Sequence, residues 1–158
     1  MRGNDKLLEV LNRRLADELT AINQYMVHSE MCENLGYSKL HFALRKHAIE
    51  EMHHAEWLIE RINILDGSPT ISKLNSIRIG KTVFEMVSNF QDAEAAGLKA
   101  YNAAIKIAHE FSDDGSVELL DKILTMEEGH IDWVAFQRSQ IEQMGLDYLV
   151  NQSEAFAN

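Results

Sequence analysis

Four glutamates occupy apolar helix faces, where their carboxylates could serve as metal ligands. Each interrupts a run of apolar residues that recur every three or four positions: Glu18, Glu51, Glu94 and Glu127. An unpaired carboxylate is costly to bury in an apolar core, and four close together would repel one another. The four side chains must therefore be protonated, or a strong positive charge must lie among them.

Two histidines extend this pattern. His54 follows Glu51 by three residues, and His130 follows Glu127 by three residues. Residues three apart on a helix share a face, so each glutamate and its histidine can reach the same ion. Two segments thus supply a lone glutamate, and two supply a Glu-x-x-His pair.

The six candidate ligands repeat within the chain. Glu18 and Glu94 are 76 residues apart, as are Glu51 and Glu127, and His54 and His130. This repeat predicts a pseudo-symmetric site for two metal ions. Four carboxylates and two imidazoles form a hard, oxygen-rich donor set that suits iron or manganese. Bridging carboxylates can hold two such ions about 3.5–4 Å apart.

Four long amphipathic helices are expected to position these side chains. The first two cover about residues 5–35 and 38–65. A connection over 66–81 precedes the third helix, which opens with a capping box at Thr82 and Glu85. The fourth follows a turn at 113–116 and ends at Gly145, and a short fifth helix is expected from residue 146 to about 156. We predict an all-α four-helix bundle with a long crossover, forming one domain over 1–158.

Composition narrows the possible functions. The 158 residues carry a net charge of −10, with one proline, Pro69, and one cysteine, Cys32. A single cysteine rules out an internal disulfide and any Cys-rich metal site. The negative charge argues against nucleic acid or an anionic membrane as a partner. No apolar run is long enough to span a membrane, and no signal-peptide block is seen, so a cytoplasmic location is expected.

The sequence resembles the bacterioferritin family along nearly its whole length. The resemblance rests on short motifs around the candidate ligands: Glu18-Leu19, Ala21-Ile22-Asn23-Gln24-Tyr25, Glu50-Glu51-Met52, His54-Ala55-Glu56 and Glu127-Glu128-Gly129-His130-Ile131-Asp132-Trp133. The candidate ligand set is also that of ferritin-like di-iron bundles.

This resemblance implies an iron-storage ferroxidase. It implies a homo-oligomeric shell of 24 subunits, built from dimers, in which iron(II) is oxidised by O2 or H2O2 and stored as ferric mineral. The family's di-iron ligands map onto Glu18, Glu51, His54, Glu94, Glu127 and His130. Haem b or a related iron porphyrin would lie between two subunits with Met52 as axial ligand, and a small ferredoxin would serve as reductant.

The position of Met52 is compatible with this haem site. Met52 lies about 100° round the helix from Glu51, away from the metal face. With Ile49 and Ile59 it forms a second apolar strip, which suggests contact with another subunit. Met52 could equally fill a dimer interface without binding haem.

Some positions depart from the family pattern. Certain members have an inner-surface iron site formed by a histidine and an aspartate, where this chain has Lys46, His47 and Glu50. That additional site is therefore not predicted. Tyr25 and Trp133 are the aromatic residues best placed for a role in oxidation. The remaining histidines lack a matching carboxylate and are expected at the surface or in an interface: His28, His41, His53 and His109.

Three other functions share parts of this sequence pattern. A di-iron peroxidase of the rubrerythrin kind usually adds a Cys-rich iron domain, which one cysteine cannot form. A haem-binding shell with a vestigial metal site would not need an intact ligand set. A starvation-type small ferritin places its ligands between subunits and would not need the 76-residue repeat.

Overall fold

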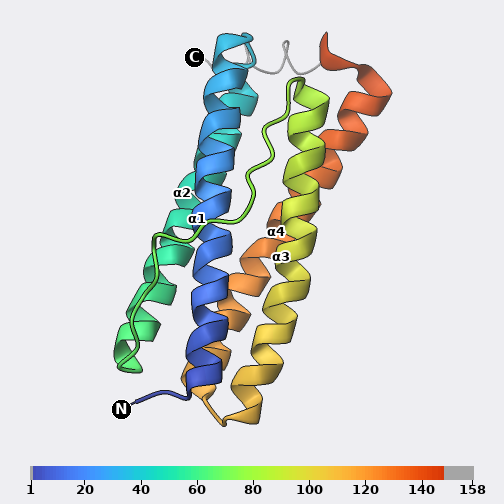
Figure 1. Ribbon diagram of the computed structural model, residues 1–158. Coiled ribbons are helices and arrows are strands. Elements are labelled where there is room, and N and C mark those ends of the chain that lie inside the picture. The colour runs from blue at the N-terminus through green and yellow to red at the C-terminus, as the bar shows by residue number, and fades with distance from the viewer. Residues whose placement is uncertain (1, 148–158) are drawn as a thin grey trace.

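The computed structural model describes residues 2–147, and within them the chain forms a bundle of four long helices (Figure 1). In chain order these are α1 (Asp5–Asn34), α2 (Ser38–Ile64), α3 (Val83–Glu110) and α4 (Asp114–Met144). Short links join α1 to α2 and α3 to α4. The expected fifth helix falls largely on 148–158, outside the described residues. No helix in the described part is long and apolar enough to cross a membrane.

Local sequence explains where the helices begin and end. The predicted capping box at α3 is confirmed, because Thr82 accepts from the Glu85 backbone N–H and the Glu85 side chain accepts in return. Gly145 ends α4 with φ +74°, in the left-handed region that favours glycine. The predicted turn at 113–116 was placed too far along the chain. Asp113 caps the backbone N–H of Ser116, so α4 already begins at Asp114.

The long connection, which we call the strap (residues 66–81), crosses the length of the bundle from the end of α2 to the start of α3 (Figure 1). This crossing makes α2 and α3 parallel, whereas each short link joins two antiparallel helices. Four side chains of α1 accept hydrogen bonds from strap backbone N–H groups: Asn12 from Thr70, Thr20 from Asn75, Gln24 from Arg78, and His28 from Gly80. A stripe of polar side chains on α1 therefore supplies hydrogen-bond acceptors for strap backbone N–H groups that would otherwise be paired within a helix or sheet.

Two apolar clusters fill the bundle on either side of a polar layer. One includes Leu11, Leu58 and Leu120, and the other includes Leu44 and Phe90. The predicted glutamates and the two paired histidines are buried between these clusters. The bundle thus encloses a layer of charged groups, which its apolar ends shield from water.

Candidate metal centre

The bundle brings all six predicted ligands into one buried cluster, which we call the metal centre. Glu18 comes from α1, Glu51 and His54 from α2, Glu94 from α3, and Glu127 and His130 from α4. None of the six residues is more than 4% exposed. Helical spacing turned each side chain inward, and the packing of four helices brought the six together.

The cluster divides into two overlapping groups. One group contains Glu18, Glu51, His54 and Glu127, and the other contains Glu51, Glu94, Glu127 and His130. Within each group, one potential ligand atom per residue lies within 4.8 Å of all the others. Glu51 and Glu127 belong to both groups, so their carboxylates lie where each could contact two ions.

The histidines present the same ring nitrogen to the cluster. His54 Nδ1 lies 3.1 Å from Glu51 Oε2 and 3.1 Å from Glu127 Oε1. His130 Nδ1 lies 3.0 Å from Glu51 Oε1 and 3.5 Å from Glu94 Oε2. Both Nε2 atoms therefore point away from the centre, toward other partners.

Burial and mutual contact divide the four carboxyls into two kinds. Burial and the nearby Glu18 carboxylate raise the pKa of Glu51 well above its usual value. Burial and the Glu94 carboxyl raise the pKa of Glu127 to about 11. Burial also acts on Glu18 and Glu94, but their carboxyl and histidine neighbours outweigh it and hold both pKa values below the usual range. Two ionised glutamates are thus paired with two protonated ones.

Both histidines of the metal centre are protonated at neutral pH. Burial alone would lower the pKa of His54, but contact with the carboxyl groups of Glu127, Glu18 and Glu51 raises it to about 12. Burial is likewise outweighed at His130, where contact with Glu94 is the main cause of a pKa of about 9. Two imidazolium groups therefore balance the two ionised carboxylates.

Hydrogen bonding nevertheless leaves several buried atoms poorly satisfied. Glu51 Oε1, Glu94 Oε2, Glu127 Oε1 and His130 Nδ1 have no well-directed hydrogen bond within the described residues. Natural proteins rarely leave such groups without a partner. All four atoms are good donors to a metal ion, so the cluster has the composition and orientation of a cation-binding site.

A pair of tyrosines holds the two ionised glutamates. Tyr25 donates to Glu94 Oε1 at 2.6 Å, and Tyr101 donates to Glu18 Oε1. Burial and the neighbouring carboxylates raise the pKa of both phenols well above the usual value, so both remain donors. Tyr101 was not among the site residues predicted from the sequence. Its role was detectable, because Tyr25 and Tyr101 are also 76 residues apart.

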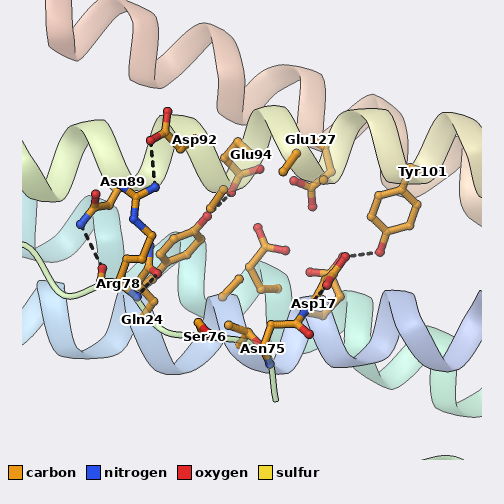
Figure 2. Close-up of a pocket in the computed structure, with 18 residues that line it drawn as sticks. Asp17, Gln24, Asn75, Ser76, Arg78, Asn89, Asp92, Glu94, Tyr101 and Glu127 are labelled. Atoms are coloured by element: carbon orange, nitrogen blue, oxygen red, sulfur yellow. Dashed lines mark hydrogen bonds and ion pairs between the residues drawn. The ribbon is translucent and has the colours of Figure 1, made fainter. Parts of the chain in front are cut away.

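A cavity of about 290 Å³ extends from the metal centre to the outer side of the bundle, between α1, α3 and the strap. Figure 2 shows Glu94 and Glu127 at this cavity, with Arg78 and Asp92 at its rim. Arg78 and Asp92 are exposed and form an ion pair of 3.0 Å. The cavity gives a small ion or molecule a path toward the carboxylates.

Met52, the predicted haem ligand, lies on the surface of α2 and outside the metal centre. It is 42% exposed, and nearby Ile49 is similarly exposed. Among the candidate redox aromatics, Tyr25 contacts the centre directly, whereas the Trp133 ring packs against His47 and Phe90.

Two of the histidines expected at the surface or in an interface are buried within the chain. His28 Nε2 accepts a hydrogen bond from the backbone N–H of Gly80 in the strap, and His41 Nδ1 forms a hydrogen bond with the Ser29 hydroxyl. His53 and His109 are exposed, as expected. Sequence reasoning missed His28 because its partner is the backbone of a distant, irregular segment.

Known proteins are similar to this sequence over most of its length. A family model for the ferritin-like domain matches residues 8–144. Bacterioferritin of Mycobacterium leprae is 38% identical over 145 residues, which cover 92% of this chain and 91% of that protein. Bacterioferritin of Rhodobacter capsulatus is 38% identical, with 92% and 90% covered. Bacterioferritin of Streptomyces coelicolor is 36% identical, with 92% and 87% covered.

Proposed function

Because the chain belongs to the bacterioferritin family, we propose that it is an iron-storage protein with ferroxidase activity at the metal centre. One observation carries this proposal: two buried groups of ligands share Glu51 and Glu127. Such an arrangement suits a pair of divalent ions bridged by two carboxylates. In this proposal each ion takes one histidine, and Glu18 and Glu94 each bind a single ion.

The substrate is iron(II), which suits a donor set of carboxylates and imidazoles. The oxidation balances with either proposed oxidant. Two iron(II) ions and H2O2 take up two protons and yield two iron(III) ions and two waters. With O2, two iron(II) ions and two protons yield two iron(III) ions and H2O2.

The residues of the chain position the iron and release protons when it binds. Tyr25 and Tyr101 fix the ionised carboxylates of Glu94 and Glu18 by donating to one oxygen of each. The second oxygens face the metal centre, with Glu18 Oε2 at 3.7 Å from His54 Nδ1 and Glu94 Oε2 at 3.5 Å from His130 Nδ1. Glu51 and Glu127 release their protons when the ions enter, because a divalent charge outweighs the burial and the carboxylate repulsion that keep them protonated.

Storage requires an assembly and a route for electrons. We place the ferric product as mineral inside a 24-subunit homo-oligomeric shell, in line with the family. Met52 and the same residue of a second subunit would hold haem b or a related porphyrin, and the exposed apolar surface around Met52 suits that role. When bound, the haem would supply electron transfer for iron release, with a small ferredoxin as the reductant.

The ferroxidase proposal is tested by mixing metal-free protein with iron(II) in air and following the ferric absorbance. We expect rapid oxidation by the wild type and loss of the fast phase in Glu51→Ala and His130→Ala. Glu56→Ala is the matched control, because Glu56 is an exposed glutamate on the same helix as Glu51. A wild-type rate equal to that of the Glu51 and His130 variants would refute the activity.

The assembly and haem proposals have separate tests. Analytical ultracentrifugation should show a particle of 24 chains, and a purely monomeric or dimeric protein would contradict the shell. Reconstitution with haem should give a bis-methionine spectrum that disappears in Met52→Leu. An unchanged spectrum in that variant would exclude Met52 as the ligand.

A further inference from the structure

The internal repeat reaches beyond the ligands, which allows the two halves of the metal centre to be compared position by position. Tyr25 and Tyr101 correspond, and so do Trp57 and Trp133, at the same offset of 76 residues. Each tyrosine donates to the ionised glutamate contributed by the helix opposite its own. The symmetry fails at the outer nitrogens of His54 and His130, the Nε2 atoms that face away from the metal centre.

On one side, the outer nitrogen of His130 meets a carboxylate. His130 Nε2 lies 2.7 Å from Glu50 Oε2. A carboxylate can only accept a hydrogen bond, so His130 Nε2 carries the proton and Nδ1 is directed to the metal centre. This is the arrangement in which an outer carboxylate orients a metal-binding imidazole and raises its basicity.

On the other side, the outer nitrogen of His54 meets a thioether. His54 Nε2 lies 3.4 Å from Sδ of Met126, the residue 76 positions after Glu50. A thioether sulfur is a weak, uncharged acceptor, so it adds little electron density to the ring. His54 itself is fully buried.

The next residues outward repeat this contrast. His47 is buried with its ring centroid 4.4 Å from that of His130, and its Nδ1 lies 3.6 Å from Glu50 Oε2. The corresponding residue 76 positions later is Ile123, which is fully buried in an apolar cluster. Polar residues, Glu50 and His47, therefore lie behind His130, whereas the corresponding positions behind His54 are apolar.

We infer that Glu50 is a positioning residue that makes the two halves of the metal centre unequal, so that the first divalent ion binds at the His130 half. This rests on the proposed function, because it requires that the centre bind two ions. The carboxylate of Glu50 holds the His130 ring in one orientation and makes Nδ1 a stronger donor. Met126 provides no equivalent support for His54.

Anaerobic titration of the full-length metal-free protein with cobalt(II) tests this inference, with the visible absorption of bound cobalt as the readout. The wild type should bind two ions in two resolved steps. His130→Ala should remove the stronger step and His54→Ala the weaker one. Glu50→Met should weaken the stronger step by about 10- to 100-fold, the usual effect of losing such an outer partner.

Reciprocal variants separate a specific effect from general damage. Met126→Glu should tighten the weaker step, and the double variant Glu50→Met with Met126→Glu should restore two steps with their order reversed. Reversal would appear as loss of the stronger step in His54→Ala made on that background. Glu56→Met is the matched control, because it makes the same change at an exposed position of α2.

Three outcomes would overturn the inference. Two equal steps in the wild type would show that the halves are equivalent, and unequal steps that do not respond to Glu50→Met would show that Glu50 is not the cause of their difference. A third cobalt ion lost in Glu50→Met, with the first two unchanged, would make Glu50 a ligand together with His47. Each of these leaves the proposed function standing. Cobalt binding that is insensitive to His54→Ala and His130→Ala would instead contradict the metal centre itself.

Discussion

Binding of two divalent ions should expel protons from the metal centre, because the metal-free cluster is neutral only when it is partly protonated. At pH 7 the rings of His54 and His130 carry a proton each, given pKa values of about 12 and about 9. Glu51 and Glu127 each hold a proton in this account, because burial raises the pKa of Glu127 to about 11 and that of Glu51 well above its usual value. We therefore expect about four protons to leave when two ions bind.

The charges balance in both states. Without metal, two imidazolium rings offset the ionised carboxylates of Glu18 and Glu94. With metal, four positive charges offset four carboxylates and both rings are neutral. Each released proton changes the affinity about tenfold per pH unit, so lowering the pH from 7 to 6 should weaken binding of the pair by about four powers of ten.

Calorimetry of anaerobic cobalt(II) binding in buffers of different ionisation enthalpy measures the number of protons released. That number should fall by one as the pH passes about 9, where His130 loses its proton in the metal-free protein. Glu56→Gln, which alters an exposed glutamate, should leave the number unchanged. Release of one proton or fewer per pair of ions, or an affinity independent of pH, would refute the assigned protonation states.

Three further predictions concern the described contacts. Tyr101→Phe removes the donor to Glu18 and should weaken one cobalt(II) step by about 1.5–3 kcal/mol in a titration; an unchanged isotherm would contradict a positioning role. The raised histidine pKa values stabilise the metal-free fold below pH 6.5, and this contribution is lost as the pH rises through about 9 for His130 and about 12 for His54. Chemical unfolding of metal-free protein should therefore show a free energy of unfolding that falls above pH 7, by about 1.4 kcal/mol per pH unit for each proton retained by the fold. A free energy of unfolding that rises over this range would contradict the raised histidine pKa values. Gly80→Ala should lower the thermal midpoint, because a Cβ there would lie 2.6 Å from a backbone nitrogen of α3, with a cost of roughly 1–3 kcal/mol; equal midpoints would show that the strap can shift freely.

The sequence was sufficient to predict the helices and the inward-facing glutamates. Periodicity of three and four residues determines which side chains share a helix face, and this property belongs to each segment alone. It therefore placed Glu18 and Glu94 on apolar faces, and the Glu-x-x-His spacing placed His54 and His130 beside Glu51 and Glu127. The capping box at Thr82 was equally local and was also confirmed. The 76-residue repeat predicted that two halves would face each other.

The tertiary structure decided what lies across from each side chain, because helix periodicity does not specify which residues of neighbouring helices meet. It placed Glu50 on the outer nitrogen of His130 and Met126 on that of His54, although neither contact follows from spacing along one helix. It buried His28 beneath the strap, where an irregular backbone supplied the partner. The sequence by itself determined which glutamates and histidines face inward, whereas packing between helices determined which of them meet and the different partners of His54 and His130.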